Sequence, residues 1–577
     1  MMKPVPDHLK GELWTRRILF GIVLVLAFGL RIFGVQFGLP YIYHADEPVV
    51  VNHALAYGTG DLHPHFFKIP PLVSYLLFLA YGIFFLTGRV FGIFQRISDF
   101  EYFFYADPSA FYLIARFLFG VAAGTASVAV LYHLIRKHFD PDRALLSAFF
   151  MAIAFLHVKD SHYAYVDIPL VFVLILAFFP ILKMIGGDDR VRSHLLTGIL
   201  TGLAIGTKYN GMVVVVPYFY ASVMARERGR ILKGWMAFLG GFVPVLVATN
   251  PYAFLDFAFF LKELTIQSKA QCGVGWIQHL RYSLAGGLGL PLLACALVGL
   301  GRQFFAPHPK AGCLAVFIVF YYMILSLWGQ PYDRYALPLI PFLLFMAADL
   351  IVGLSQPLRG LRIPFLVLSA AVVSAPSIIS CLLFGKIMLE KDVRTVAKDW
   401  VVQNIPSGTR LALDWDFYVP RLKFSRAQLE EKQQEVLSLQ NFSRAQLRRL
   451  DYLLNHDQSA EPAYELYFLL DDPIASPRFL FAKPGVPYDV SFLQFRGIEY
   501  VIIVRLHDRL ERSDFFRDLI DHSELVARFS PYRDLSRQGS YDSVPLTGGP
   551  FLLGDLLLRT RNGQMIEIYR LKPAPNR

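Results

Sequence analysis

The chain has 577 residues, of which 55% are hydrophobic and only 18% are charged. This composition is too apolar for a soluble globular protein and indicates several membrane-spanning helices. The net charge of +11 is typical of a membrane protein with basic cytoplasmic loops, so it gives no support for nucleic-acid binding. No metal-ligand spacing and no disulfide framework is indicated by the four cysteines, Cys272, Cys295, Cys313 and Cys381.

A short basic leader, residues 1–17, precedes an apolar run over residues 18–38. The run is too long for the hydrophobic part of a signal peptide, and no small-residue cleavage site follows it. We therefore expect a cytoplasmic leader and a retained first helix.

Further apolar segments follow the first helix and predict about eleven spans in total. Basic loops such as "RKHFDPDR" and "ARERGRILK" separate them and are expected on the cytoplasmic side. The loops between those basic ones then lie on the opposite, outer face, together with everything after residue 385. The further predicted spans are 111–135, 144–158, 168–185, 195–207, 211–225, 235–249, 284–301, 311–328, 336–352 and 363–385.

The first outer loop, residues 39–110, contains the apolar segment 70–94, which is long enough to span. One extra crossing there would move every later basic loop to the outer face, against the positive-inside rule. We therefore expect this segment to lie in the membrane interface or to re-enter, packed against protein.

Residues 386–577 change character and predict a soluble, extracytoplasmic α/β domain after the membrane domain, 18–385. A helical segment leads into strand-like "GTRLALDWDF", "EYVIIVRL" and "MIEIYRL". The motif "FSRAQL" occurs twice, at 424–429 and 442–447. In each copy a Ser is followed three residues later by Gln, which is typical of a helix start with a capping box and a hydrophobic staple.

Two adjacent acids, Asp46 and Glu47, follow the first span directly, where burying charge is costly and is usually functional. A desolvated carboxylate there can act as a general base. The alternative is a solvated pair of loop acids. The density of polar neighbours favours a site, and these neighbours are His44, His53, Asp61, His63, His65 and Lys68.

Later outer loops add further polar groups. Asp167 starts a helix, where it is expected to cap the helix alone or also to serve a site. Lys208 and Tyr209 suit a phosphate, although Lys208 could also extend to lipid headgroups. Arg334 and Tyr335 suit a phosphate as well, with an ordinary salt bridge from Arg334 to its neighbour Asp333 as the alternative. We expect a further set of polar residues to stabilise these loops or to contact the acceptor: His44, His65, Asp61, His162 and Asn250.

Acids and bases from several helix ends thus converge on one face of an apolar bundle. A substrate with a lipid tail, a phosphate and a transferable polar group fits this arrangement. The carboxylates would activate a nucleophile while the phosphate leaves.

Six segments in the same order resemble C-type membrane glycosyltransferases, specifically the dolichyl-phosphate-mannose–protein mannosyltransferase (family 39) and aminoarabinose transferase group. The resemblance extends from about residue 15 to 420, and less distinctly through "FRGIEYVIIV". The segments are "HADEP…GTGDLHPHFFKIPPL", "SHYAYVDIPL", "GLAIGTKYNG", "GLGLPLLACALVGL", "DRYALPLIPFLLFMAA" and "DVRTVAKDWVVQNIPSGTRLAL".

This resemblance implies a multi-span, inverting transferase that takes a sugar from a polyprenyl-phosphate donor on the non-cytoplasmic face. It implies Asp46 as the catalytic base, Glu47 as its assistant and Asp167 as a second acid. Arg334 is a donor-phosphate candidate, and Lys68 lies near a basic residue that precedes proline in aminoarabinose transferases. Some members of the superfamily need a divalent metal and this subgroup generally does not, so a metal stays open, with Asp46, Glu47 and Asp167 as its candidate ligands.

The expected protein is therefore a mainly α, polytopic membrane helix bundle with an outer α/β domain, located in the bacterial inner membrane. Its expected partners are the lipid-linked donor, the bilayer and a hydroxyl acceptor in a protein, glycolipid or polysaccharide. The alternatives are a transporter or flippase for a lipid-linked or charged substrate, and a scaffold whose membrane part is only an anchor. Transporters tend to have paired internal repeats, and the sequence shows no such symmetry. An anchor would not require polar groups at several helix ends.

Overall fold

The structure, a computed structural model, describes the chain from residue 7 to 573 with gaps. Cys272 and the start of the second "FSRAQL" motif, residues 442–443, lie outside the described residues. The described ranges are 7–187, 190–225, 231–270, 275–327, 332–414, 418–438, 444–457, 459–469, 486–505, 513–534 and 553–573.

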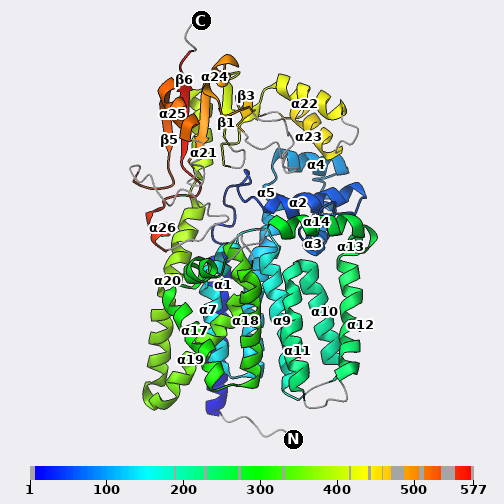
Figure 1. Cartoon of the computed structure of the whole chain (residues 1–577), viewed down its shortest axis with the longest axis vertical. Coiled ribbons are helices and arrows are strands. Elements are labelled where there is room, and N and C mark those ends of the chain that lie inside the picture. The colour runs from blue at the N-terminus through cyan, green and yellow to red at the C-terminus, as the bar shows by residue number, and fades with distance from the viewer. Residues whose placement is uncertain are drawn as a thin grey trace.

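Each predicted span contains a helix, and these helices stand side by side in a bundle (Figure 1). By length and composition alone, 6 of the helices in the described ranges could cross a membrane, or up to 7 if a bent pair is one span. The chain is thus a mainly α, multi-pass membrane protein. The helices found at the predicted spans are α1 (Asp7–Ile32), α5 (Ser109–Arg116) with its continuation α6 (Ala123–His138), α7 (Pro141–Ile153), α9 (Asp167–Ile185), α10 (Val191–Thr207), α11 (Val215–Met224), α12 (Ile231–Thr249), α17 (Leu290–Phe305), α18 (Pro309–Ser326), α19 (Ile340–Ser355) and α20 (Arg362–Leu389).

Three predicted helix boundaries are wrong for local reasons. The first helix ends at Ile32 rather than at residue 38, because Gly34 and Gly38 turn the chain with φ of 85° and 71°. The segment 144–158 divides at Ala154, whose backbone is extended, into α7 and the short α8 (Phe155–Asp160). The segment 284–301 bends by 115° at Gly289, so its straight helix begins at Leu290.

Helices α10 and α12 approach each other closely because glycines line their contact. A Cβ on Gly198 would lie 2.0 Å from the Phe238 carbonyl oxygen, and one on Gly241 would lie 2.3 Å from the Leu195 carbonyl oxygen. Small residues of this kind let helix backbones pack tightly in a membrane. The contact fixes the end of α10, where Lys208 follows.

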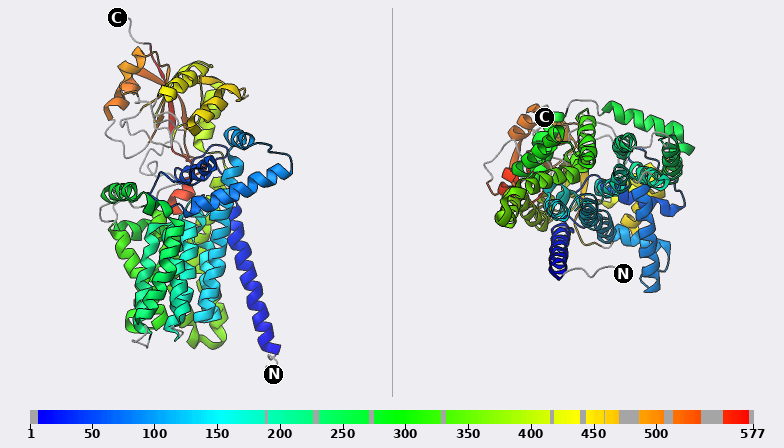
Figure 2. Two further views of the ribbon diagram at one scale, coloured as in Figure 1. Left: turned by 90° about the vertical axis from the view of Figure 1, so that its right-hand side faces the viewer. Right: turned by 90° about the horizontal axis from the view of Figure 1, so that it is seen from below.

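The helix α3 (Leu72–Val90) lies across the end of the bundle rather than along it (Figure 2). It is long and apolar enough to span, yet its direction agrees with the predicted interfacial segment. One side of the helix packs on protein through residues such as Leu77, while Ile83 on the other side is 67% exposed. The C-terminal domain lies beyond this end of the bundle, and α1 begins at the other end (Figure 1).

The C-terminal domain begins with α21 (Val393–Asn404) and contains a six-stranded sheet of order β2-β3-β1-β4-β6-β5. Strands β2, β3, β1 and β4 are parallel, whereas β6 and β5 run antiparallel to their neighbours. The predicted strand segments are found as β1, β4 and β6. The strands are β1 (Arg410–Leu413), β2 (Lys423–Phe424), β3 (Ala463–Phe468), β4 (Tyr500–Val504), β5 (Ser523–Phe529) and β6 (Ile566–Leu571).

The first "FSRAQL" motif starts a helix as predicted, but its capping box is incomplete. The hydroxyl oxygen of Ser425 accepts a hydrogen bond from the backbone N–H of Gln428 at 3.3 Å, at the start of α22 (Arg426–Ser438). The Gln428 side chain does not reach back to the helix start. It bonds instead with both backbone groups of Leu466 on β3, so it joins the helix to the sheet.

Candidate active site

Asp46 stands at the start of α2 (Glu47–Ala56), directly after the turns that follow α1. It occupies the N-cap position, yet its side chain makes no capping hydrogen bond. Its carboxylate instead lies 3.0 Å from the guanidinium of Arg334, and only 16% of the side chain is exposed. The carboxylate is therefore directed toward a distant part of the chain rather than used to stabilise its own helix.

Asp167 was expected to cap α9, and this part of the prediction is wrong. Val166 is the N-cap residue, and Asp167 is the first residue of the helix proper. One carboxylate oxygen of Asp167 accepts a 2.6 Å hydrogen bond from Lys208. The other oxygen is buried without a hydrogen-bond partner and lies 3.8 Å from Arg334 Nε, which also lacks one.

Lys208 and Arg334 reach these acids from two further helix ends. Lys208 follows α10 in extended backbone, and its ammonium lies 4.7 Å from the ring centre of Tyr335. Arg334 lies in the 3-10 turn η6 (Asp333–Leu339) that precedes α19, with its guanidinium 4.3 Å from the ring centre of Tyr332. The ring of Tyr335 also faces it, at 5.5 Å.

We call Asp46, Arg334, Asp167 and Lys208 the acid–base cluster. Acids and cations alternate in it, and Asp167 and Arg334 are only 3% and 8% exposed. Charges in such a dry setting interact more strongly than they do in water. The two cations can bind an anion only by sharing or releasing the carboxylates that now hold them.

A second charged group lies beside the cluster and was not singled out from the sequence. Lys159 is buried in α8, forms an ion pair with Asp333 and lies 3.5 Å from Asp160. Burial is the main cause that raises the pKa of Asp160 from its ordinary 3.8 to about 7. Asp333 in turn accepts from the backbone N–H of Arg334 at 2.7 Å, so this group fixes the position of that arginine. The adjacent Lys and Asp in "HVKDSHY" were the available signal.

Glu47 lies beside Asp46 in sequence but not in the cluster. It is fully buried, and both its oxygens accept from the Arg116 guanidinium, at 2.7 and 2.8 Å. One of them also accepts from the Ala164 amide. Arg116 additionally donates to the carbonyls of Val35 and Phe37. The pair thus ties the chain after α1 to the bundle.

His44 supports Asp46 directly. It is 2% exposed, stacks on the Tyr163 ring at 4.1 Å, and its Nδ1 accepts the backbone N–H of Asp46. Burial lowers the pKa of His44 to about 4. It is therefore a neutral support at physiological pH and not an acid.

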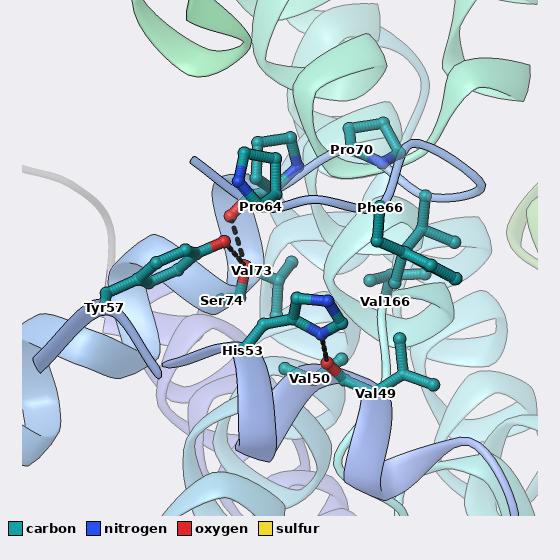
Figure 3. A pocket seen from close by; sticks show the side chains of 12 residues that line it. Val49, Val50, His53, Tyr57, Pro64, Phe66, Pro70, Val73, Ser74 and Val166 are labelled. Atoms are coloured by element: carbon teal, nitrogen blue, oxygen red, sulfur yellow. Dashed lines mark hydrogen bonds between the residues drawn. The ribbon is translucent and has the colours of Figure 1, made fainter. Parts of the chain in front are cut away.

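The predicted residues of the first outer loop lie apart from the cluster. His65 and Asp61 are exposed and pair with each other at 2.8 Å. Lys68 is also exposed, and its ammonium lies 5.9 Å from the ring centre of Phe66. His53 points into a small, mostly apolar pocket between α2 and this loop, which no residue of the cluster lines (Figure 3).

The remaining predicted residues make structural contacts. The hydroxyl of Tyr209 donates to the Phe67 carbonyl at 3.0 Å, which holds the first outer loop in place. His162 is buried with its ring nitrogens against the Val158 and Phe33 carbonyls. Asn250 is buried at the end of α12 and donates to Thr249.

The candidate metal ligands do not fit a metal ion. Glu47 is paired with Arg116, and Arg334 lies between Asp46 and Asp167. Within the described ranges, no group of three or more His, Cys, Asp or Glu side chains is placed to hold a metal.

Comparison with known proteins gives a family match over part of the chain and a similar fold. Residues 109–254, which include Asp167 and Lys208, match the dolichyl-phosphate-mannose-protein mannosyltransferase family. No curated protein sequence matches the chain.

Among solved structures, the apo oligosaccharyltransferase of Archaeoglobus fulgidus is similar, with a TM-score of 0.52 at 12% identity over 88% of this chain and 71% of that one. ArnT from Cupriavidus metallidurans gives a TM-score of 0.49 at 15% identity over 90% and 97%. The protein O-mannosyltransferase Pmt1-Pmt2 complex of S. cerevisiae gives 0.32 at 21% identity over 45% and 35%. Together, the family match, the fold shared with the archaeal oligosaccharyltransferase and the apolar helices confirm the resemblance predicted from the sequence, to multi-pass membrane glycosyltransferases of the C type.

Proposed function

We propose that this protein transfers a sugar from a polyprenyl-phosphate donor to a hydroxyl acceptor, with Asp46 as the general base. The observation that carries the proposal is the alternation of two acids and two cations at one end of an apolar bundle, with Asp167 and Arg334 buried and Asp46 and Lys208 partly buried. A lipid tail can lie along such a bundle while its phosphate meets the cations. The matched family is described by a dolichyl-phosphate-linked mannose donor, which supports the same class of substrate.

The phosphate of the donor would bind Arg334 and Lys208. Arginine offers a planar fork that suits two phosphate oxygens, and lysine adds a compact positive charge. The buried Arg334 Nε lacks a hydrogen-bond partner and would gain one from a phosphate oxygen once Arg334 shares or releases its carboxylates. Tyr335 packs beside both cations and would limit their movement.

Donor binding would also prepare the base. Arg334 holds Asp46 as an ion pair, which keeps the carboxylate ionised but makes it a weak base. A donor phosphate that engages Arg334 would weaken this pair and raise the proton affinity of Asp46. The base would then act only when a donor is in place.

In the chemical step, Asp46 takes the proton of the acceptor hydroxyl as the acceptor oxygen bonds to the anomeric carbon of the sugar. The bond between that carbon and the phosphate oxygen breaks, and its electron pair leaves with the phosphate. Arg334 and Lys208 stabilise the added negative charge. Attack opposite the leaving phosphate would invert the anomeric centre. Asp167 would hold Lys208 in position and would not touch the sugar.

The setting that we propose is the bacterial plasma membrane, with the acid–base cluster and the C-terminal domain, residues 386–577, outside the cytoplasm. The basic loops at the opposite end of the bundle support this orientation. The acceptor would be a hydroxyl of a protein, glycolipid or polysaccharide. Nothing in the geometry favours the transporter alternative.

The test is a transfer assay with the purified full-length protein in lipid vesicles. Labelled polyprenyl-phosphate sugars of several kinds would be offered with membrane extracts as the source of acceptors. We expect at least one donor to lose its label to a hydroxyl acceptor. No transfer from any of these donors, by protein that binds polyprenyl phosphate, would overturn the proposal.

A further inference from the structure

The C-terminal domain contacts the segment that carries Asp46 through helix α21. Arg394 of this helix is 3% exposed, and its guanidinium lies 3.8 Å from the ring centre of Tyr43. The Tyr43 hydroxyl and the Thr395 hydroxyl are 2.8 Å apart. Arg394 is itself fixed by Asp392, with two hydrogen bonds of 2.8 Å to its carboxylate.

A second contact lies one turn further along α21. Lys398 is 4% exposed, donates to the Tyr41 hydroxyl at 2.6 Å and lies 4.5 Å from the centre of that ring. Glu461, elsewhere in the domain, accepts from the same ammonium at 2.7 Å. Two cations on one helix therefore hold the aromatic rings of Tyr41 and Tyr43, which belong to the same irregular segment.

This segment, residues 41–46, ends at the proposed base, and we call it the strap. Only two residues separate Tyr43 from Asp46. One of them, His44, stacks on Tyr163 and accepts the Asp46 amide proton. The strap is thus fixed by the C-terminal domain at one end and by the membrane bundle at the other, where Asp46 meets Arg334.

We propose that α21 is a positioning element of the transferase, and that Arg394 and Lys398 set the location of Asp46 through the strap. The inference rests on the proposed function and assigns the C-terminal domain a part in it. Contacts between a cation and an aromatic ring are strongest when both are desolvated, as Arg394 and Tyr43 are here. A displacement of a reacting group by about 1 Å can lower a rate by about 100-fold.

The prediction separates turnover from donor binding. In Arg394→Ala, kcat should fall by about 10- to 100-fold, because the base is misplaced. Binding of polyprenyl phosphate should fall far less than kcat, because Lys208 is held by Asp167 and the Arg334 guanidinium also lies against Asp167 and the Tyr332 ring. Arg394→Lys should recover part of kcat. Tyr43→Phe keeps the ring against Arg394 but loses the hydroxyl contact with Thr395, so its kcat should lie between those of wild type and Tyr43→Leu, whereas Tyr43→Leu should behave like Arg394→Ala.

The matched control is Arg410→Ala, which removes an arginine from a surface ion pair with Glu465 in the same domain. It should leave kcat unchanged. A second readout does not depend on activity: amide hydrogen exchange of the peptide that contains the strap should increase in Arg394→Ala and Tyr43→Leu, but not in Arg410→Ala.

The outcomes distinguish the two proposals. If wild type transfers sugar and both Arg394→Ala and Tyr43→Leu keep its kcat, the positioning role is wrong and the proposed function stands. Lost activity with unchanged exchange in the strap would also overturn the positioning role. If wild type transfers no sugar, the proposed function fails, and the exchange data alone decide whether α21 holds the strap. Should Arg394→Ala not fold, the comparison of Tyr43→Phe with Tyr43→Leu gives the same decision.

Discussion

Arg334 Nη2 lies 3.0 Å from Asp46 Oδ2, although the two residues are far apart in the sequence, near the beginning and near the end of the membrane domain. The contact joins the start of α2 to the turn before α19. It places the proposed phosphate ligand directly against the proposed base. Occupation of Arg334 by a donor phosphate and release of Asp46 are therefore two aspects of one event.

Arg334→Lys tests the phosphate contact. Lysine keeps the charge but loses the planar fork, and it cannot fill the same position between Asp46 and Asp167. We expect binding of polyprenyl phosphate to weaken by about 1.5–3 kcal/mol, as for the loss of a hydrogen bond to a charged group. Binding can be measured by displacement of a labelled lipid phosphate in vesicles.

Lys68→Ala is the control for that measurement, because Lys68 is a cation in an exposed loop and lies over Phe66. Its donor affinity should equal that of wild type. Equal affinities for Arg334→Lys and wild type would remove Arg334 from the phosphate site.

The Glu47–Arg116 pair predicts a change in stability rather than in chemistry. Glu47→Gln leaves the fully buried Arg116 without its carboxylate. Removal of one partner from a buried ion pair costs about 3–5 kcal/mol. The thermal unfolding midpoint of the detergent-solubilised protein should therefore fall clearly.

Replacement of both partners, Glu47→Leu with Arg116→Leu, should recover part of that loss, because no charge stays buried alone. Recovery will be incomplete, since Arg116 also satisfies the Val35 and Phe37 carbonyls. If Glu47→Gln unfolds at the wild-type midpoint yet transfers no sugar, Glu47 takes part in the reaction and its structural role is refuted.

The raised pKa of Asp160 predicts that the free energy of unfolding depends on pH. Its pKa is raised from 3.8 to about 7 in the folded protein, chiefly by burial, with Lys159, Asp333, Asp167 and Arg334 around it. The unfolded chain therefore releases this proton at lower pH than the folded protein does. The contribution of Asp160 to the free energy of unfolding is complete below about pH 4 and is lost as the pH rises through 7.

Asp160→Asn cannot titrate, so it isolates this contribution. Relative to wild type, the variant should gain stability between pH 5 and pH 8, because the other titrating groups are common to both proteins. The unfolding midpoints of both proteins at the two pH values give the comparison. A constant difference between variant and wild type would show that Asp160 does not titrate in this range.

The helix contact between α10 and α12 gives a further prediction. Gly198→Val places side-chain atoms where the Phe238 carbonyl lies, 2.0 Å from the Cβ position. The helices must separate, which shifts Lys208 at the end of α10. We expect a lower unfolding midpoint and weaker donor binding. Gly240→Val on α12 is the control, since a Cβ there meets nothing within 4 Å; equal effects of both changes would argue against the packing explanation.

The helices at the apolar runs could be predicted because such runs need no tertiary information, although 6, or up to 7, of the described helices have the length and composition of a span, against about eleven predicted. Their breaks could not, because Ala154 and Gly289 bend the chain through backbone geometry that the apolar pattern does not encode. The direction of α3 across the end of the bundle agrees with the prediction made from the alternation of basic and other loops, which is a global constraint on the whole chain.

The acid–base cluster was predicted in part for a similar reason. The alternation of basic and other loops predicted that Asp46, Asp167, Lys208 and Arg334 lie on one face of the bundle. The structure brings their side chains into contact. Glu47 was grouped with Asp46, but consecutive residues at a helix start point about 100° apart. It therefore reaches Arg116 instead.

The Lys159–Asp333 pair joins α8 to the turn before α19, which is remote in sequence. The adjacent Lys159 and Asp160 indicate a charged group there, but no local pattern identifies Asp333 as the partner. Tyr209, His162 and Asn250 were expected in the site because they are polar groups near helix ends. Each is instead used to satisfy a nearby backbone carbonyl or side chain. Sequence position alone does not distinguish these two uses.

The most direct test of the account is single-turnover transfer by Asp46→Asn with the donor already bound. Asparagine keeps the size of the side chain but cannot accept the acceptor's proton at neutral pH. The account predicts that polyprenyl-phosphate sugar still binds, while the rate of transfer falls by about 100-fold or more. Transfer at the wild-type rate from bound donor would contradict the assignment of Asp46 as the base.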